Sequence, residues 1–181
     1  MRLAYTMATG RGDLDPLLRD VAARAAARGR RLAGIVQVNS DRPGCARCDM
    51  DAVVLPEGPV IRISQALGPD ARGCRLDPAG LESAVAASQA RLRDGADLLI
   101  VNKFGKQESA GRGFRPVIAE ALERGADVLV GVNGLNLDAL RAFTGDLATP
   151  LPPHPDALLT WIVGSIAPDP EAPVDGPTNS R

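Results

Sequence analysis

The stretch Asp97-Leu98-Leu99-Ile100-Val101-Asn102 decides how the rest of the sequence is interpreted. Four successive apolar residues between two polar ones are typical of a strand that is buried on both faces, as central strands of a parallel sheet are. Gly95 stands just before it, where a preceding helix would end. The stretch therefore predicts a central strand with helices packed on both of its sides.

Helix and strand signals alternate around this strand. We expect further strands at residues 2–6, 32–38 and 127–132, and helices at residues 16–28, 78–94, 114–123, 137–143 and 156–166. Asp15-Pro16 and Asp77-Pro78 each place an N-cap acid before a proline that suits the first helical position. Because strand, helix and strand follow one another within about forty residues, parallel crossover connections are favoured over hairpins.

One short arm interrupts the alternation. Residues 52–55 and 60–64 are apolar runs separated by Pro56-Glu57-Gly58-Pro59, which predicts a β-hairpin inserted between parallel units. The predicted fold class is α/β, with three layers: a mainly parallel sheet, helices on both faces and the small hairpin insertion. Residues 1–167 form the single predicted domain, and the proline-rich residues 168–181 are predicted to be a disordered tail.

The composition favours an α/β protein and gives no sign of nucleic-acid binding or membrane insertion. The chain has 181 residues, 45% of them apolar and only 3% aromatic, which suits aliphatic packing between helices and a parallel sheet. The net charge of −1 gives no global field to draw the protein to nucleic acid. No apolar run reaches the roughly 18 residues of a membrane span, and no secretory signal is recognised, so we expect a cytoplasmic protein without membrane insertion. A homo-oligomer is compatible with the sequence.

The loops after the strands are the expected functional surface, because ligands of open parallel sheets bind at the carboxyl ends of the strands. Residues 7–15, 39–51, 102–115 and 133–136 should gather at that edge. The partner expected there is a small anionic ligand, either an oxyanion or a nucleotide.

The first of these loops has the position of a phosphate-binding loop, and its candidate ligand-binding residues are Thr9, Gly10, Arg11, Gly12 and Asp13. A working loop of that kind has Gly-Lys-Ser/Thr, where lysine neutralises phosphate and the hydroxyl holds Mg²⁺. Here Asp13 and Leu14 follow Gly12, so the cation and the hydroxyl are both missing. The simpler interpretation is that Asp15 caps the helix and Asp13 complements its dipole.

The loop after the central strand carries the strongest binding signal. Its candidate ligand-binding residues are Asn102, Lys103, Lys106 and Arg112, accompanied by Glu108 and three glycines. Cationic side chains and accessible backbone amides are suited to an oxyanion. The alternative is a solvated basic loop in which Glu108 is an internal partner.

The three cysteines form a second, separate candidate site. Cys45 and Cys48 make a CxxC pair, and Cys74 follows downstream, so the three thiols are candidate ligands for Zn²⁺ or another metal. His154, the single histidine, is one candidate for the fourth ligand, although its place between prolines before a helix is typical of a surface residue. The alternative is three free thiols, and a structural disulfide is not expected in the cytoplasm.

The segment DLLIVNKFGKQESAGRGFRPVIAEAL, with the leading loop, VIRISQALG and GCRLD, resembles a bacterial family of unknown function that is grouped with the P-loop nucleoside triphosphatases. Members are often encoded beside molybdenum-uptake components. The resemblance covers most of residues 1–165 and implies a P-loop-NTPase-like fold. By analogy with the cancer-related nucleoside-triphosphatase group, Asn102 takes the place of a magnesium-binding acid and Glu108 that of a water-activating catalytic glutamate.

Three functions follow from these observations as alternatives. The first is an oxyanion- or nucleotide-binding protein with a degenerate P-loop-like site, connected to molybdenum metabolism. The second is a divergent nucleoside triphosphatase, with Mg²⁺ as cofactor, in which Glu108 activates water. The third is a metal-binding or redox-sensing interaction protein built on the cysteines. The sequence favours binding over catalysis because the magnesium and phosphate residues are replaced at both ends of the site.

Overall fold

The computed structural model describes residues 1–8, 10, 12–40, 49–65 and 75–164. Its strands are β1 (Leu3–Thr6), β2 (Leu32–Ser40), β3 (Asp49–Val54), β4 (Val60–Arg62), β5 (Leu98–Phe104), β6 (Asp127–Val132) and β7 (Ala148–Leu151). Its α-helices are α1 (Leu14–Ala26), α2 (Pro78–Arg93), α3 (Lys106–Ser109), α4 (Arg115–Glu123), α5 (Leu137–Thr144) and α6 (Pro155–Val163). Two 3₁₀ turns, η1 (Gly134–Asn136) and η2 (Gly145–Leu147), flank α5.

One sheet of seven strands, in the order β4-β3-β2-β5-β6-β1-β7, runs through the molecule. The strands from β2 to β7 in this order pair in parallel. The hairpin arm of β3 and β4 pairs antiparallel at the β2 edge. In the sheet, β5 and β6 lie between β1 and β2, so the strand order reverses across β5 and β6. The predicted mainly parallel sheet with a small hairpin insertion is confirmed.

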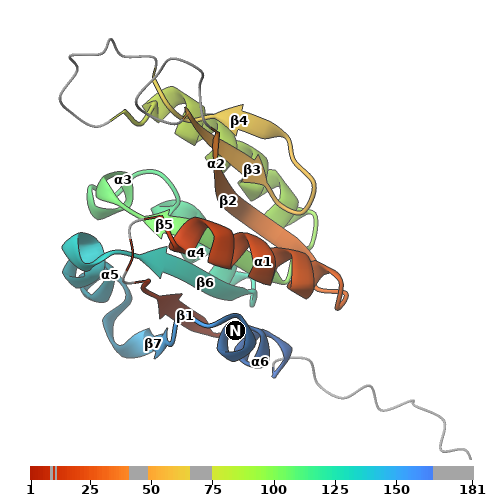
Figure 1. Ribbon diagram of the computed structural model, residues 1–181. Coiled ribbons are helices and arrows are strands. Elements are labelled where there is room, and N and C mark those ends of the chain that lie inside the picture. The colour runs from red at the N-terminus through yellow and green to blue at the C-terminus, as the bar shows by residue number, and fades with distance from the viewer. Residues whose placement is uncertain (9, 11, 41–48, 66–74, 165–181) are drawn as a thin grey trace, which may run out of the picture.

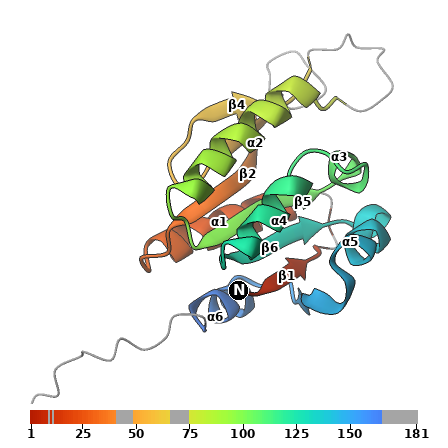
Figure 2. The ribbon, with the colours of Figure 1, turned by 180° about the vertical axis from the view of Figure 1, so that it is seen from behind.

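Helices cover both faces of the sheet (Figure 1, Figure 2). α1 and α6 pack on one face through Leu18, Val21, Leu158 and Ile162, all essentially inaccessible to solvent. α2, α4 and α5 pack on the other face and form the larger of the two cores. The three-layer architecture therefore follows from two separate apolar cores, one on each side of the sheet.

The apolar run of β5 serves both cores. Leu98 and Ile100 face α1, whereas Leu99 and Val101 belong to the core under α2 and α4, and all four are fully buried. This is the alternation expected of a strand with two covered faces. It explains why the run is continuously apolar and confirms β5 as a central strand.

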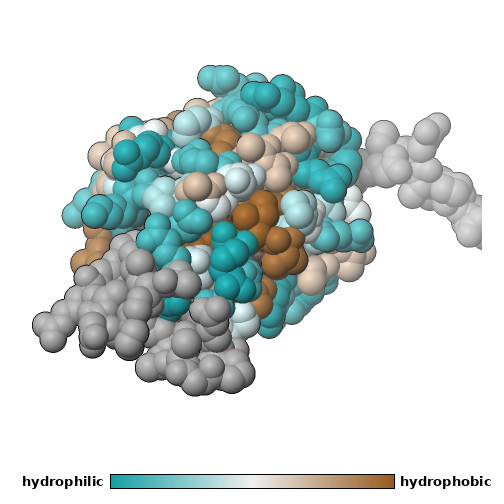
Figure 3. Space-filling model, turned by 90° about the horizontal axis from the view of Figure 1, so that it is seen from above, coloured by the Kyte–Doolittle hydropathy of each residue, from teal (hydrophilic) through white to brown (hydrophobic). Residues whose placement is uncertain are grey.

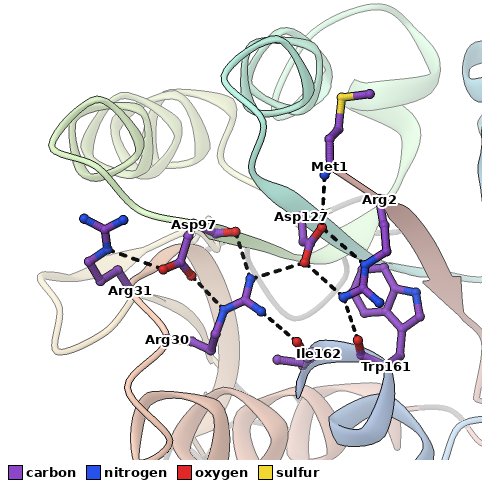
Figure 4. A network of polar contacts seen from close by, with 8 residues as sticks. All are labelled: Met1, Arg2, Arg30, Arg31, Asp97, Asp127, Trp161 and Ile162. Atoms are coloured by element: carbon purple, nitrogen blue, oxygen red, sulfur yellow. Dashed lines mark hydrogen bonds and ion pairs between the residues drawn. The ribbon is translucent and has the colours of Figure 1, made fainter. Parts of the chain in front are cut away.

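A partly buried ionic network lies at the amino ends of the parallel strands (Figure 4). Arg30, just before β2, donates to Asp97 and Asp127, and also to the backbone carbonyl of Ile162 in α6. Arg2 donates to Asp127 at 3.0 Å and to the carbonyl of Trp161. Both arginines thereby supply cations to the C-terminal turn of α6, whose carbonyls lack helical partners.

Several elements differ from the sequence prediction. The helix expected from Pro16 begins at Leu14, two residues earlier, and β3 begins at Asp49 rather than at Ala52. α3 was not expected within residues 102–115, and β7 was not expected at all. The cap predicted at Asp77 is confirmed, since its side chain accepts a hydrogen bond from the amide of Ala79.

One face of the domain is predominantly polar (Figure 3). The face seen from above in the orientation of Figure 1 is mostly hydrophilic, with a small apolar patch near its middle (Figure 3). Within residues 1–164, as far as they are described, no helix has the length and hydropathy needed to cross a bilayer.

Candidate functional site

Three loops meet at the carboxyl edge of the parallel strands. The first turn of α1, after β1, contacts the end of β5 through a hydrogen bond from Asn102 to Asp15. The loop after β5 contacts the turn after β6, because the Ser109 hydroxyl donates to the side-chain oxygen of Asn136 at 2.9 Å. The predicted gathering of the loops on one rim is therefore observed for the described residues. Residues 41–48, also expected there, lie outside them.

A buried carboxylate lies at the centre of this edge. Asp15 is only 6% exposed, and its Oδ1 accepts a 2.8 Å hydrogen bond from Nδ2 of Asn102. Its Oδ2 accepts from Nδ2 of Asn39 at 2.8 Å and from Nε2 of Gln37 at 3.3 Å. Among the residues that the structure describes, no cation lies within ion-pairing distance of Asp15. Three neutral amides therefore hold this carboxylate.

The orientation of the Asn102 amide is fixed by its second contact. Its Oδ1 accepts from the backbone N–H of Gln37 at 3.0 Å, so Nδ2 must face Asp15. Asn39 Oδ1 accepts in turn from Gln37 Nε2 at 2.8 Å. The network joins α1, β2 and β5 and satisfies each carboxylate oxygen.

The helix-capping role expected of Asp15 is wrong. The N-cap of α1 is Asp13, whose side chain makes no capping hydrogen bond, and Asp15 lies inside the first turn. The Asp13 carboxylate instead lies over the backbone of Gly10, where an added Cβ would overlap it. Gly12 has φ +93°, which other residues rarely adopt. Thr9 and Arg11 lie outside the described residues.

A β-bulge brings Asn102 and Lys103 to the edge together. The register of β5 against β6 passes from Val101 opposite Val130 to Phe104 opposite Val132, so two residues of β5 face one of β6. That one residue is Gly131, where a Cβ would overlap the carbonyl oxygen of Asn102. Bulges of this kind re-aim side chains beside functional sites. Here Asn102 is buried and Lys103 is exposed.

The predicted cationic residues of this loop have different environments. Lys103 and Lys106 are exposed, and no carboxylate lies within 4.0 Å of either among the described residues. Arg112 is exposed but donates to the side-chain oxygen of Gln107 at 3.0 Å. Arg115 is half-buried and stacks over the ring of Phe143, 4.5 Å from its centroid. The two lysines are therefore exposed cations with no carboxylate partner among the described residues, whereas Nε of Arg112 is engaged by Gln107 and Arg115 is stacked on Phe143.

Glu108 has a structural environment. It is 3% exposed, its Oε2 accepts from the amide of Gly105 at 2.9 Å, and its Oε1 accepts from the amide of Phe114 at 3.0 Å. These contacts hold both ends of the loop and supply acceptors for amides at the starts of α3 and α4. The alternative in which Glu108 is an internal partner of the loop matches this geometry. Its water-activating role stays a prediction, and it would require these hydrogen bonds to open.

The cysteine site lies elsewhere. Cys45, Cys48 and Cys74 all fall outside the described residues, so the predicted Zn²⁺ site stays a prediction. Within the described part of the chain no group of three or more His, Cys, Asp or Glu side chains is arranged to hold a metal ion. His154 is exposed at the N-cap of α6, as expected of a surface residue.

Sequence reasoning missed the individual residues that complete the edge: Gln37, Asn39, Ser109 and Asn136. Asn39 and Asn136 belong to segments that were expected at the rim, yet nothing in their spacing identifies their partners. Gln37 was assigned to the interior of a strand. For Gln37 and Asn39 the one detectable signal is a side-chain amide at the end of a predicted strand; Ser109 and Asn136 have no such signal.

Comparisons with known proteins agree with this architecture. The model of a family described as "Protein of unknown function (DUF2478)" matches residues 3–161. One curated relative, the molybdenum import ATP-binding protein ModC 2 of Bradyrhizobium diazoefficiens, is 39% identical over 161 residues. The alignment covers 88% of this chain but 18% of that protein, so the chain spans less than a fifth of its relative's length.

Two solved structures have the same fold. The human cancer-related nucleoside triphosphatase superposes with a TM-score of 0.60 at 18% identity, covering 91% of this chain and 96% of that one. THEP1 from Aquifex aeolicus gives a TM-score of 0.63 at 15% identity, covering 91% and 98%. At such low identity the likeness shows the fold alone. It confirms the P-loop-NTPase-like architecture that the sequence resemblance implied.

Proposed function

The chain belongs to the DUF2478 family of proteins of unknown function. From the geometry of the site we propose that it binds a small oxyanion at the carboxyl edge of its sheet and does not hydrolyse nucleotides. The site is centred on Lys103 and Lys106 rather than on the loop after β1. A nucleotide held through one phosphate is the second ligand class for the same lysines.

The distribution of lysine carries this proposal. Lys103 and Lys106 are the two lysines of a chain with 21 basic residues, and both stand on the loop after β5. Many of the arginines, by contrast, are paired with carboxylates, as Arg30, Arg62 and Arg93 are. An ammonium group is a compact charge with three donors, which suits the oxygens of a tetrahedral anion.

Molybdate is the most specific form of the proposal. Its support is the name of a relative, a molybdenum import ATP-binding protein, to which this chain aligns over 161 residues. Molybdate and tungstate are doubly charged tetrahedral anions, so the two ammonium groups of Lys103 and Lys106 would together match their charge.

Ligand-induced stabilisation tests the proposal. Molybdate, tungstate, phosphate, sulfate, AMP and MgATP are each titrated while the melting temperature is followed. A ligand at 100 times its Kd stabilises by about 2.7 kcal/mol, or about 5–10 °C for a domain of this size. The Lys103→Ala/Lys106→Ala double variant should lose the shift. Absence of any shift at millimolar ligand contradicts the proposal.

A matched control separates the site from overall charge. Arg19→Ala/Arg91→Ala also removes two exposed cations, from α1 and α2, and should keep the shift. Because the chain has just two lysines, reductive ¹³C-dimethylation labels the proposed site and the α-amino group alone. Ligand binding should move the two lysine resonances in the NMR spectrum. Unmoved lysine resonances during a thermal shift would relocate the site.

A further inference from the structure

The first turn of α1 contains a carboxylate, that of Asp15. Asp15 occupies the first turn, where the unpaired amides and the dipole of the helix favour negative charge. In nucleoside triphosphatases with a phosphate-binding loop, the phosphates of the ligand occupy that position. In this chain a side chain already supplies the charge.

Asn102 and Asp15, which face each other at the start of α1, carry their negative charge on the opposite element from the one that carries it in a magnesium-phosphate site. Such a site places a hydroxyl on the helix to hold the metal and, in many members, an acid at the end of a neighbouring strand. Here the strand residue is the amide Asn102 and the helix residue is the carboxylate Asp15, joined at 2.8 Å. The strand residue and the helix residue are still in contact, but the negative charge is on the helix residue instead of the strand residue.

The arrangement is fixed rather than incidental. The Asn102 amide is held by the backbone of Gln37, and Asn39 and Gln37 fill the second oxygen of Asp15. Asp13 adds a further carboxylate at the same helix start, over Gly10. A polyphosphate that extended from Lys103 to the start of α1 would bring its negative charge toward the carboxylates of Asp13 and Asp15, whereas a compact anion held by the lysines alone would not need to extend there.

We propose that Asp15 is a specificity-determining residue that restricts the ligand to a single-centre oxyanion or one phosphate group and excludes di- and triphosphates. This inference rests on the proposed function for the identity of the lysine site. It adds the ligand class: phosphate, molybdate or a monophosphate, rather than pyrophosphate, tripolyphosphate or MgATP.

The test compares affinities for inorganic phosphate and tripolyphosphate by calorimetry. The wild-type protein should bind tripolyphosphate at least about tenfold more weakly than phosphate, although tripolyphosphate carries the larger charge. Asp15→Asn keeps the shape and removes the charge, so the ratio of the two affinities should move at least about tenfold toward tripolyphosphate. Asp138→Asn, which removes an exposed acid from the first turn of α5, should leave the ratio within about twofold.

A second variant keeps the inference testable if Asp15→Asn fails to fold. Asp15→Asn/Asn102→Asp exchanges the two side chains and keeps both the net charge and the carboxylate–amide pair. With Mg²⁺ present, it should bind MgATP more tightly than the wild type does. A folded Asp15→Asn or exchange variant with an unchanged ratio overturns the inference.

The outcomes also separate this inference from the proposed function. If the wild-type protein binds phosphate and tripolyphosphate equally well, the oxyanion site stands and the role of Asp15 is refuted. If the wild type binds no oxyanion but Asp15→Asn gains tripolyphosphate binding, the role of Asp15 is supported and the proposed function fails. If no variant binds tripolyphosphate, the role of Asp15 is refuted.

Discussion

The guanidinium of Arg30 lies 3.3 Å from the carboxylate of Asp127, and both side chains are nearly inaccessible, at 7% and 4% exposure. The pair lies at the amino edge of the sheet, on the side opposite the candidate site. Arg2 and the amino group of Met1 also pair with Asp127, and Arg2 stacks over the ring of Trp161, 4.4 Å from its centroid.

Removing the charge of Asp127 should destabilise the whole domain. Asp127→Asn removes one of the carboxylates that pair with the buried Arg30, and breaking a buried ion pair costs about 3–5 kcal/mol. The free energy of unfolding in urea should fall by about that amount. Asp94→Asn, at an exposed position after α2, should change it by less than about 0.5 kcal/mol.

Glu108→Gln should loosen the loop after β5. The variant amide can accept from one of the Gly105 and Phe114 amides, and it then turns its own donor toward the other. An unsatisfied buried donor costs about 1–3 kcal/mol. Amide hydrogen exchange of residues 105–114 should accelerate, while the exposed Glu123→Gln control should not change it. Unchanged protection in a variant that abolishes phosphate release from ATP would instead support the catalytic role of Glu108.

Gly34→Ala should prevent normal pairing of β2 with β5. Gly34 has φ +105°, and a Cβ there would overlap the carbonyl oxygen of Ile100 in the neighbouring strand. Gly29→Ala is the matched control, because Gly29 also has positive φ, +80°, but nothing lies within 4 Å of its added Cβ. Gly29→Ala should cost about 1 kcal/mol, and Gly34→Ala several times more, measured by chemical unfolding. Equal costs would mean that backbone conformation, not the close approach to Ile100, requires glycine at 34.

Glu120 should make the packing of α2 on α4 sensitive to acid. A hydrogen bond from Arg93, then one from Gln89 and one from Arg124, lowers the pKa of Glu120 from 4.5 to about 2. Since the folded state holds the ionised form, this stabilisation is complete above about pH 4.5 and is lost as the pH falls through about 2. The difference in melting temperature between the wild type and Glu120→Gln should therefore shrink below pH 4.5. A difference that does not vary with pH would assign the effect to packing.

Much of the architecture could be predicted because it depends on local patterns. The continuous apolar run of β5 indicates burial on both faces, and Asp77-Pro78 marks the start of α2. β7 gave no such signal, because Ala148-Thr149-Pro150-Leu151 is short and contains a proline that only an edge strand tolerates. Its place in the sheet is set by pairing with β1, which is far away in the sequence.

The sequence predicted the location of the site, at the carboxyl edge of the sheet, but not the hydrogen bonds within it. Asp15 before Pro16 matches the pattern of an N-cap, and the same pattern fits a buried acid two residues further along, inside the first turn. What distinguishes the two is Asn102, 87 positions away, which one sequence cannot place beside it. The bulge that exposes Lys103 likewise depends on Gly131 of the adjacent strand.

The amino-edge network has a practical consequence for attaching other domains. Arg2 and Arg30 hold α6 next to β1, so the first described residues and the end of α6 leave the domain on the same edge (Figure 1). A fluorophore or fused protein attached at Met1 or directly after Val163 would therefore sit on the edge opposite the lysine-bearing rim. Fusions should leave ligand access unobstructed, whereas an insertion at residues 105–113 would block it.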